Sequence, residues 1–328
     1  MELRIKSNPV IYLFVNNSIQ SKKPVICIMG PTASGKTQVS LKLAANFPLE
    51  IISVDSAQVY RHMDIGTAKP GIAVLKKTPH WLINILNPEE IYSAGSFVSD
   101  AQKIINKIHL KGKIPMLVGG TMLYFRSLIN GISNLPDANS EVRNQINREA
   151  QEKGWPKLHD ILHDIDPEAA EQINPNDRQR IQRALEIFRL SGKTPSSLKN
   201  INVVRKPEYN YIKLALIPYS REKLYDRINN RFIEMLNHGF VKEVKFLRDR
   251  VGLSINSVSM QAVGYRQIWS HLDGDISLEE ATFKTQSSTR QLAKRQLTWL
   301  RNEPGLSSFD SLKEDVFDTI FSHMKNKL

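Results

Sequence analysis

The 328-residue chain contains one cysteine, Cys27, and no long apolar run. A single cysteine cannot form an intrachain disulfide, which excludes a small disulfide-bonded scaffold, and it cannot build a cysteine metal site. Its place in the apolar run Val25 to Met29 indicates a buried small side chain in a reducing compartment. The longest apolar run, Val10 to Val15, is far shorter than the roughly 18 residues that a membrane-spanning helix needs. We therefore expect no membrane span.

The first residues also lack the features of a secretory signal. Arg4 and Lys6 precede the short apolar run, but Asn16-Asn17-Ser18 offers no small-residue cleavage site. We expect an extra strand or a frayed leader here, and we assign residues 1–23 no function.

Acidic residues are few relative to basic ones: 33 Asp and Glu stand against 45 Lys and Arg, a formal charge of +12. This excess favours a polyanionic partner, although a solvated basic surface without any partner would have the same composition. Apolar residues make up 41% and charged residues 24%, as in ordinary globular proteins. A chain of this length exceeds the usual size of one core, so we expect two domains or one domain with an insertion.

The strongest local signal is the G-x-x-x-x-G-K-T pattern of a phosphate-binding loop, between a strand predicted over 24–29 and a helix predicted over 38–47. In such a loop the backbone N–H groups and the helix N-terminus cradle phosphate oxygens, the lysine adds a positive charge and the threonine can bind Mg²⁺. We assign the phosphate site to Gly30, Pro31, Thr32, Ala33, Ser34, Gly35, Lys36 and Thr37, with Thr37 as the magnesium ligand. The pattern does not identify the phosphorylated compound.

Two further predicted strands, 49–55 and 114–118, end in polar or flexible residues. Ligands bind at the carboxyl ends of strands in open parallel sheets, so both ends are candidate site positions. Asp55 could be a general base, a magnesium partner through water, or only a cap for the following turn, and its position favours a functional role. Gly119-Gly120 could let the backbone approach a ligand to which Thr121 offers its hydroxyl. The segment could equally be an ordinary strand exit with Thr121 as a helix cap.

The middle of the chain departs from this alternation of strands and helices. Residues 142–191 read as helices separated by prolines, which predicts a helical insertion. A helix over 177–190 would carry Ile181 and Leu185 on its apolar side and Arg180 and Arg183 on the opposite, outward side. The stretch 192–207 is predicted to be the linker back to the core.

The strand and helix pattern resumes after the insertion. A strand over 211–217 precedes a helix that starts at Ser220, on which Arg227 and Arg231 lie one turn apart. This spacing suits a clamp on a diphosphate or an RNA phosphate, or an ordinary exposed face. A helix over 281–302 has five basic residues and no acid, with Arg290, Lys294 and Arg301 on one stripe opposite an apolar arc, and this stripe could follow a phosphate backbone.

Several blocks of the chain, in order, resemble the tRNA dimethylallyltransferases, also called isopentenyltransferases. They extend from about residue 24 to residue 301 and are more specific than a phosphate loop alone. Two positions depart from the common bacterial pattern, since Trp81 stands where a second histidine is frequent and Asn84 where an aspartate is frequent. The blocks are Ser53–Tyr60, Met63–Pro70, Pro79-His80, Tyr92–Gly95, Val118–Tyr124, Asp177–Glu186, Val263–Gln267 and Thr289–Arg301.

The resemblance implies an α/β fold: a P-loop NTPase-like parallel sheet core flanked by helices, with an all-helical insertion domain. We divide the chain into a leader (1–23), a discontinuous core (24–134 and 207–305), a tRNA-binding insertion (135–206) and a C-terminal helix or tail (306–328). The implied reaction transfers a dimethylallyl group from its diphosphate to the exocyclic amine of the adenosine next to the anticodon. We expect a monomer in the cytoplasm, with Mg²⁺ as cofactor.

By the same resemblance, Asp55 and Thr121 are catalytic and Arg227 joins the diphosphate site. The residues assigned to tRNA are Asp55, Ser56, Ala57, Gln58, Thr121, Arg143, Gln179, Arg180, Ile181, Gln182 and Arg183. A small-molecule P-loop kinase is the main alternative, and a non-enzymatic RNA-binding NTPase is the third. Two separate arginine-bearing helices disfavour a kinase, and the blocks around Asp55 and Thr121 disfavour a non-enzymatic NTPase.

Overall fold

The computed structural model describes residues 22–131, 135–200 and 208–328. Six parallel strands form one sheet in the order β3-β2-β4-β1-β5-β6, which confirms the expected parallel core. The expected strands are β1 (Pro24–Met29), β2 (Leu49–Val54), β4 (Ile114–Gly119) and β5 (Asn210–Ile217). Two strands were not expected: β3 (His80–Trp81) has only two residues, and β6 (Leu306–Asp310) carries polar residues in its middle.

Alternation along β1 explains how the sheet is buried on both sides. Val25, Cys27 and Met29 pack into the larger hydrophobic cluster, whereas Ile26 and Ile28 pack into a second cluster on the opposite face. Successive side chains of a strand point to opposite faces, so a strand covered on both sides is apolar throughout. Cys27 is fully buried and unpaired, as its neighbours predicted, and burial raises the pKa of its thiol.

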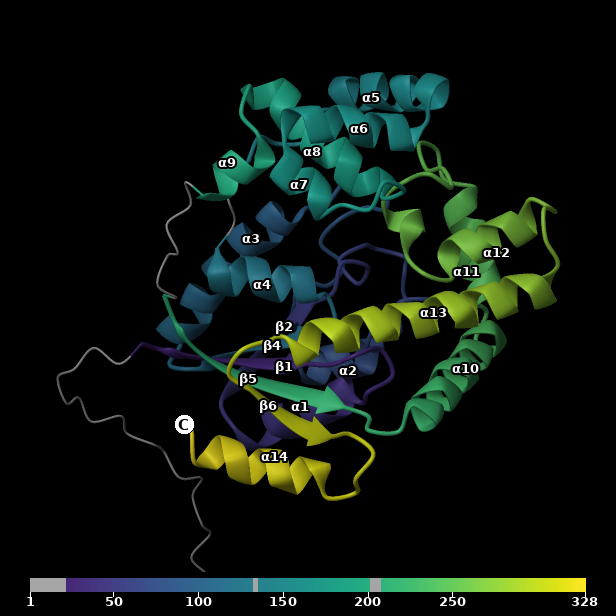
Figure 1. The fold of residues 1–328 in the computed structure, drawn as a ribbon. Coiled ribbons are helices and arrows are strands. Elements are labelled where there is room, and N and C mark those ends of the chain that lie inside the picture. The colour runs from purple at the N-terminus through teal and green to yellow at the C-terminus, as the bar shows by residue number, and fades with distance from the viewer. Residues whose placement is uncertain (1–21, 132–134, 201–207) are drawn as a thin grey trace, which may run out of the picture.

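Helices cover each face of the sheet, as Figure 1 shows. The second cluster lies between the sheet and two helices, α1 (Lys36–Asn46) and α14 (Val316–Lys325). The segment expected to be a C-terminal helix or tail thus contributes a strand and a helix to this core. The larger cluster joins the other face to α3 (Ala94–Leu110), α4 (Met122–Asn130), α10 (Arg221–Asn237), α11 (Phe240–Arg248), α12 (Tyr265–Leu272) and α13 (Leu278–Arg301). The short helix α2 (Ile72–Lys77) has no buried residue.

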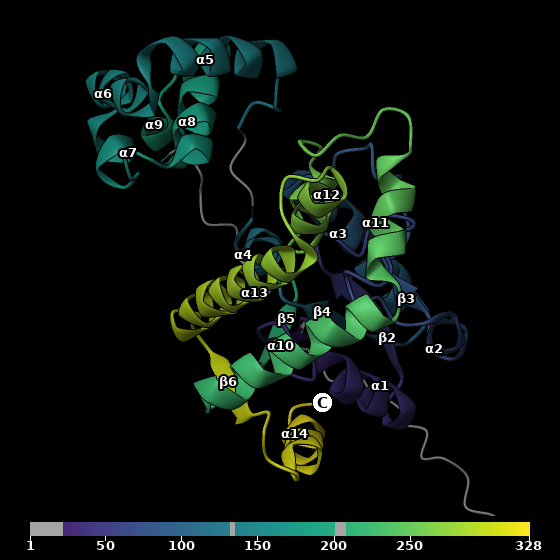
Figure 2. The same cartoon turned by 90° about the vertical axis from the view of Figure 1, so that its right-hand side faces the viewer.

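The expected all-helical insertion is confirmed, and in Figures 1 and 2 it stands apart from the sheet. It has its own hydrophobic core, which includes Leu158, Leu162 and Leu185. Pro156 and Pro167 lie in the first turns of their helices, where a missing N–H costs nothing. The helices are α5 (Ser140–Lys153), α6 (Trp155–Ile165), α7 (Pro167–Glu171), α8 (Arg178–Ser191) and α9 (Pro195–Asn200).

Helix α9 falls inside the stretch that was expected to be a plain linker. Ser196, near its start, donates its backbone N–H and its hydroxyl to the buried carboxylate of Asp166, which fastens the helix to the insertion. The rest of that linker, 201–207, lies outside the described residues, and so do residues 1–21 with the apolar run Val10 to Val15. Within the described ranges, no helix combines the length and the apolarity that crossing a bilayer requires.

Candidate active site

The predicted phosphate loop connects β1 to α1 and lines a cavity of about 1060 Å³. Gly35 adopts φ 83°, the left-handed conformation that glycine tolerates best, and serves as the N-cap of α1. Gly30 lies so close to Leu216 that an added Cβ would sit 2.6 Å from its carbonyl oxygen. Thr32 to Thr37 line the cavity, while Gly30 and Pro31 do not. The loop therefore has the backbone shape of an anion cradle at a helix N-terminus.

Lys36 is the buried charge of this loop. Its Nζ donates to the Pro31 carbonyl at 2.6 Å and to Ser34 Oγ at 3.5 Å. Burial, with the neighbouring charge of Arg231, lowers the pKa of Lys36 to about 7, and the charge of Asp55 opposes the shift. An anion beside Nζ would favour the protonated form again.

The arginine pair on α10 faces the phosphate loop. Arg231 Nη1 donates to Thr32 Oγ1 at 3.2 Å, and Arg227, one turn earlier, lines the same cavity. Burial lowers the pKa of Arg231, partly offset by the charge of Asp55, but an arginine stays charged at neutral pH. The predicted clamp geometry is therefore present, with Arg231 the more deeply placed of the two. Arg231 belongs with the site residues, although only Arg227 was assigned to the diphosphate site from the sequence.

Asp55 lies at the carboxyl end of β2 and lines the cavity. Its Oδ1 accepts from the backbone N–H groups of Ala57 and Gln58 at 2.8 and 3.2 Å. Its other oxygen, Oδ2, has no hydrogen-bond partner within the described residues. The turn-capping role and the functional role thus coexist, because one oxygen fixes the carboxylate and the other remains available to a substrate.

Thr121 follows β4 and stands at the N-cap position of α4, but its side chain does not cap that helix. Its Oγ1 instead accepts from the backbone N–H of Ser56 at 3.1 Å, which ties the end of β4 to the Asp55 turn. The hydroxyl hydrogen is then free to point at a ligand. Of the two alternatives from the sequence, the simple helix cap does not occur.

Gly119 and Gly120 line the cavity and are also in close contact with protein neighbours. A Cβ on Gly119 would lie 2.0 Å from the Val54 carbonyl oxygen, and one on Gly120 would lie 2.5 Å from Gln296 Nε2. Because Gly119 and Gly120 also line the cavity, the expectation that they let a ligand approach the backbone stays a prediction. They allow the ends of β2 and β4 and helix α13 to pack closely.

Gln296 is a site residue that the sequence did not single out. Its side chain is nearly buried; Oε1 accepts from the Thr32 N–H at 2.9 Å, and Nε2 donates to the Gly120 carbonyl at 2.8 Å. One amide from α13 therefore links the phosphate loop to the segment that carries Thr121. The sequence did contain a signal for this role, because Gln296 is a polar residue on the otherwise apolar arc of the helix.

Of the basic stripe predicted on helix α13, Lys294 and Arg301 are exposed, but Arg290 is only partly so. Arg290 packs against α10, where its Nη1 donates to Asn229 at 2.9 Å and its guanidinium lies 5.8 Å from the Tyr225 ring centre. The residues of α13 that line the cavity include Arg295 and Trp299, neither of which belonged to the predicted stripe. Helical spacing alone could not show that α10 covers part of the basic side.

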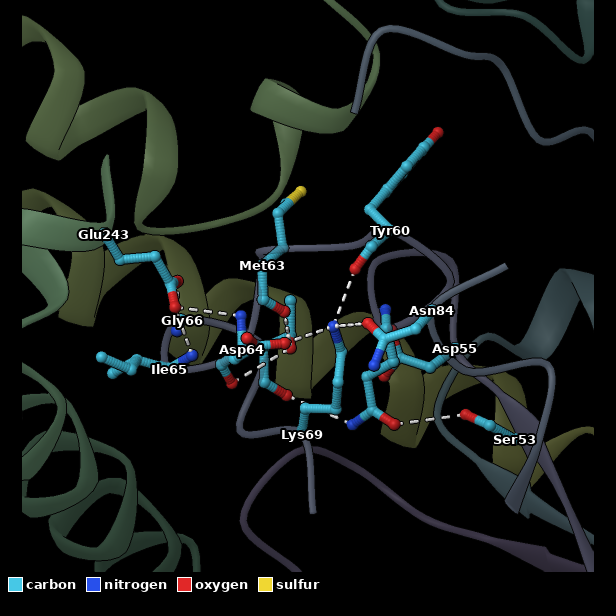
Figure 3. Close-up of polar contacts among 12 residues, drawn as sticks. Ser53, Asp55, Tyr60, Met63, Asp64, Ile65, Gly66, Lys69, Asn84 and Glu243 are labelled. Atoms are coloured by element: carbon cyan, nitrogen blue, oxygen red, sulfur yellow. Dashed lines mark hydrogen bonds and ion pairs between the residues drawn. The ribbon is translucent and has the colours of Figure 1, made fainter. Parts of the chain in front are cut away.

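A second polar cluster lies beside Asp55 and is drawn in Figure 3. Lys69 Nζ donates to the Tyr60 carbonyl, Asp64 Oδ1 and Asn84 Oδ1 at 2.6 to 2.7 Å, so each ammonium hydrogen has an acceptor. The Lys69 side chain is only 2% exposed. Asn84, one of the two departures from the family pattern, thus gives a hydrogen-bond acceptor to a buried ammonium whose charge is balanced by Asp64. Trp81, the other departure, donates from Nε1 to Glu50 at 2.9 Å.

The residues assigned to tRNA fall in two places. Ser56, Ala57 and Gln58 line the cavity with Asp55 and Thr121, whereas Arg143 and Gln179 to Arg183 lie on the insertion, away from it. Gln179 and Arg180 are exposed. Ile181 is fully buried in the core of the insertion, so the assignment of its side chain to tRNA is wrong.

Three of the predicted tRNA contacts on the insertion, Arg143, Arg183 and Gln182, already bond to other protein side chains. Glu186 is fully buried; its Oε1 accepts from Arg143 Nε at 2.9 Å, and its Oε2 accepts from Arg183 Nη1 at 2.6 Å. Although burial opposes ionisation, these arginine hydrogen bonds hold the pKa of Glu186 below its usual range. Gln182 donates to Asn147 at 2.7 Å. Arg180 keeps the most exposed guanidinium of the set, at 67%.

The cavity fits a magnesium ion only together with a phosphorylated ligand. Among the described residues, no group of three or more His, Cys, Asp or Glu side chains could hold a metal. Magnesium in phosphate sites commonly takes one or two protein oxygens and completes its shell with phosphates and waters. Thr37, at the start of α1 on the cavity wall, is placed for this role.

Comparisons with known proteins agree with one another. The family model described as IPP transferase matches residues 58–303. The tRNA dimethylallyltransferases of Nitrosospira multiformis and Thiobacillus denitrificans are 48% and 49% identical, over 92% and 89% of this chain and 94% and 93% of their own.

Solved structures give the same answer. The full-length tRNA isopentenylpyrophosphate transferase of Bacillus halodurans is 39% identical, with a TM-score of 0.68 over 94% of this chain and 97% of its own. A eukaryotic dimethylallyltransferase acting on tRNA is 28% identical, with a TM-score of 0.76 over 92% of this chain and 77% of its own.

Proposed function

The chain belongs to the IPP transferase family, and from this premise we propose that it transfers a dimethylallyl group from dimethylallyl diphosphate to tRNA. The acceptor in this proposal is the exocyclic amine of the adenosine next to the anticodon. The relatives named tRNA dimethylallyltransferase, which match along nearly their whole length, support it.

One observation carries the proposal: two kinds of chemistry face each other in one cavity. The phosphate loop, Lys36 and Arg231 form its cationic side, and Asp55 and Thr121 form a side with a free carboxylate oxygen and a free hydroxyl hydrogen. An anion held on the first side would bring its reacting carbon towards an acceptor on the second.

The bond changes assign each side a role. The adenosine nitrogen attacks the allylic carbon, the carbon–oxygen bond to the diphosphate breaks, and the diphosphate leaves with the bonding electrons. Lys36, Arg227, Arg231 and the loop N–H groups stabilise its charge. Asp55 Oδ2 accepts the proton that the amine loses, and the Thr121 hydroxyl donates to the oxygen that bridges carbon and phosphorus.

We propose Mg²⁺ as the cofactor, with Thr37 as its protein ligand. When bound, the ion would share the charge of the diphosphate and so improve it as a leaving group. The remaining steps depend on the chain's own residues, which orient both substrates and take up the proton.

The acceptor base must leave the anticodon loop stack to reach the cavity. Extrusion of a stacked base costs a few kcal/mol, which contacts elsewhere on the RNA must offset. We propose that the insertion, through Arg143, Gln179, Arg180, Gln182 and Arg183, provides these contacts, while Asp55 to Gln58 and Thr121 hold the base. Because one chain carries both the cavity and the insertion, we propose that the monomer is active. We place the reaction in the cytoplasm, where the enzyme would encounter tRNA.

A labelled-donor experiment separates this proposal from the kinase alternative. The purified chain is incubated with Mg²⁺, tRNA and dimethylallyl diphosphate labelled in the allyl group, and separately with γ-labelled ATP and a pool of small metabolites. We expect label to enter RNA only in the first reaction. Transfer of label from ATP to a small molecule, with none from the allyl donor to RNA, would favour the kinase.

A further inference from the structure

Glu243, on α11, makes an unusual set of contacts with a turn that is distant in the sequence. Its Oε2 accepts from the backbone N–H groups of Asp64 and Ile65 at 3.0 and 2.7 Å, and its Oε1 from that of Gly66 at 3.1 Å. The Tyr265 hydroxyl donates to Oε1 at 2.6 Å. Figure 3 shows the carboxylate reaching the turn from the side opposite Lys69. Four donors therefore converge on one carboxylate.

The turn is also pressed against the helices that carry these groups. A Cβ on Gly66 would lie 2.2 Å from the Phe240 ring and 2.6 Å from the Tyr265 ring. Only glycine allows this approach. The turn thus has one defined place, set by packing from α11 and α12 and by the hydrogen bonds to Glu243.

This turn also contacts Gln58, a residue of the cavity. The Gln58 Nε2 donates to the Thr67 carbonyl at 3.2 Å, and its Oε1 accepts from Ser53 Oγ at 3.2 Å. These two bonds fix which way the amide points. Together they leave one hydrogen on Nε2 and one lone pair on Oε1 unused. Gln58 lines the cavity beside Asp55. An amide with one donor and one acceptor free matches the adjacent acceptor and donor on an edge of adenine.

We propose that Glu243 is a positioning residue for the acceptor base, acting through the turn Asp64 to Thr67 on the orientation of the Gln58 amide. The proposal rests on the proposed function, since it concerns recognition of an adenine in the same cavity. Glu243 touches no substrate. Its carboxylate places the Thr67 carbonyl, and that carbonyl places the amide.

A double-mutant cycle tests this chain of contacts. Glu243→Gln, Gln58→Ala and the double variant are assayed for kcat and KM with anticodon stem-loop RNA and with dimethylallyl diphosphate. Glu222→Gln, a charge change on the exposed start of α10, is the matched control and should behave as wild type. We expect Glu243→Gln to lower kcat/KM for RNA about tenfold, the scale of a lost charge-assisted hydrogen bond, with KM for the diphosphate unchanged. In the Gln58→Ala background the same change should cost less than twofold.

The cycle also identifies the contrary results. If the two losses multiply, Glu243 does not act through Gln58, and if KM for the diphosphate rises equally, its role is general support of the fold. Tyr265→Phe, which removes only the hydroxyl that holds Oε1, provides a milder pair of variants if Glu243→Gln fails to fold. It should give a twofold to threefold loss that disappears in the Gln58→Ala background, and a loss that persists there overturns the proposal. A wild-type chain that transfers no allyl group to RNA would instead refute the proposed function.

Discussion

At the scale of single residues, the site depends on side chains whose atoms are divided between two tasks. Asp55 Oδ1 accepts from its own turn while Oδ2 remains available, and Thr121 Oγ1 accepts from one backbone N–H while its hydrogen remains available. The sequence predicts such residues from their positions at strand ends. It does not predict which atom of each side chain bonds to the protein, because the partners of Asp55 and Thr121 depend on the local backbone path.

Asp55→Asn separates the two tasks of Asp55. The asparagine oxygen can still accept from the turn N–H groups, but the amide cannot take up a proton. We expect the chemical step to slow by about 10² or more, the range for general acid-base groups, while diphosphate affinity stays near normal. Single-turnover kinetics at saturating tRNA measure the step. An unchanged rate would remove Asp55 from the mechanism.

Thr121→Ala should slow chemistry more than it weakens tRNA binding. The hydroxyl donates to the bridging oxygen only as charge develops there, so its loss affects the transition state, by about 10-fold or more. Thr121→Ser keeps the hydroxyl and is the control. Filter binding and single-turnover rates are compared, and a fall in binding without a fall in rate would assign Thr121 to RNA contact instead.

Lys36 predicts a pH dependence of donor binding. In the free protein its pKa is about 7, and a bound diphosphate raises it, so binding above pH 7 must take up a proton and affinity should fall as pH rises. Below pH 7 the lysine is already charged and this contribution vanishes. Calorimetry at pH 8 in two buffers of different ionisation enthalpy measures the uptake. The diphosphate itself also titrates in this pH range, and Lys36→Met measures that contribution alone. An uptake in the variant equal to that of the wild type would contradict the assignment to Lys36.

At the scale of elements, α13 is what joins the two halves of the site. Its Gln296 bridges Thr32 and Gly120, two segments that come from different strands. The helix itself follows from a long amphipathic pattern. Its register against the sheet cannot be read from that pattern, because the register depends on the absence of a side chain at Gly120, which admits Gln296, and on the contact of Arg290 with α10.

Gln296→Leu should therefore damage the site and the fold together. It leaves the half-buried Thr32 N–H and Gly120 carbonyl without their side-chain partner, at a cost of about 1 kcal/mol in unfolding free energy. Donor KM should rise with it, because the phosphate loop loses its tether. Chemical denaturation and steady-state kinetics are the measurements, with Gln291→Leu on the exposed face of α13 as the control. A stable variant with normal KM would show that the bridge is dispensable.

At the scale of the whole molecule, a sheet domain that holds the cavity is joined to a separate helical insertion with its own core. The strand, loop and helix order around residues 24–47 predicted the core, and proline spacing predicted the insertion. Two features could not be predicted for physical reasons. Strand β6 has serines at its centre and so gives no strand pattern, and the arginines at 143 and 183 look exposed until the buried Glu186 is placed between them. The assignment of the Ile181 side chain to tRNA was wrong because a run of consecutive helix residues includes some that face the core.

The proposed RNA contacts of the insertion predict how salt affects tRNA binding. Arg180 has the most exposed side chain of the three assigned arginines, although its Nε lies 3.3 Å from Asp177 Oδ2, so Arg180→Ala should weaken tRNA binding and lower the slope of log affinity against log salt by up to about one. Single-turnover rate at saturating RNA should not change. Arg189→Ala is the control, because Arg189 lies on the same helix but is less exposed and donates from both Nη atoms to Glu149. Equal effects of both changes would show a general charge effect and no specific contact at Arg180.

The central claim is that one cavity brings an allylic diphosphate on the phosphate loop together with an adenine beside Asp55. Mass spectrometry of nucleosides from tRNA, after incubation with the purified chain, Mg²⁺ and dimethylallyl diphosphate, tests it most directly. We expect an adenosine heavier by one dimethylallyl group, formed about 10² times more slowly when Asp55→Asn replaces the wild type. Unmodified adenosine in every nucleoside fraction of the wild-type reaction would contradict it.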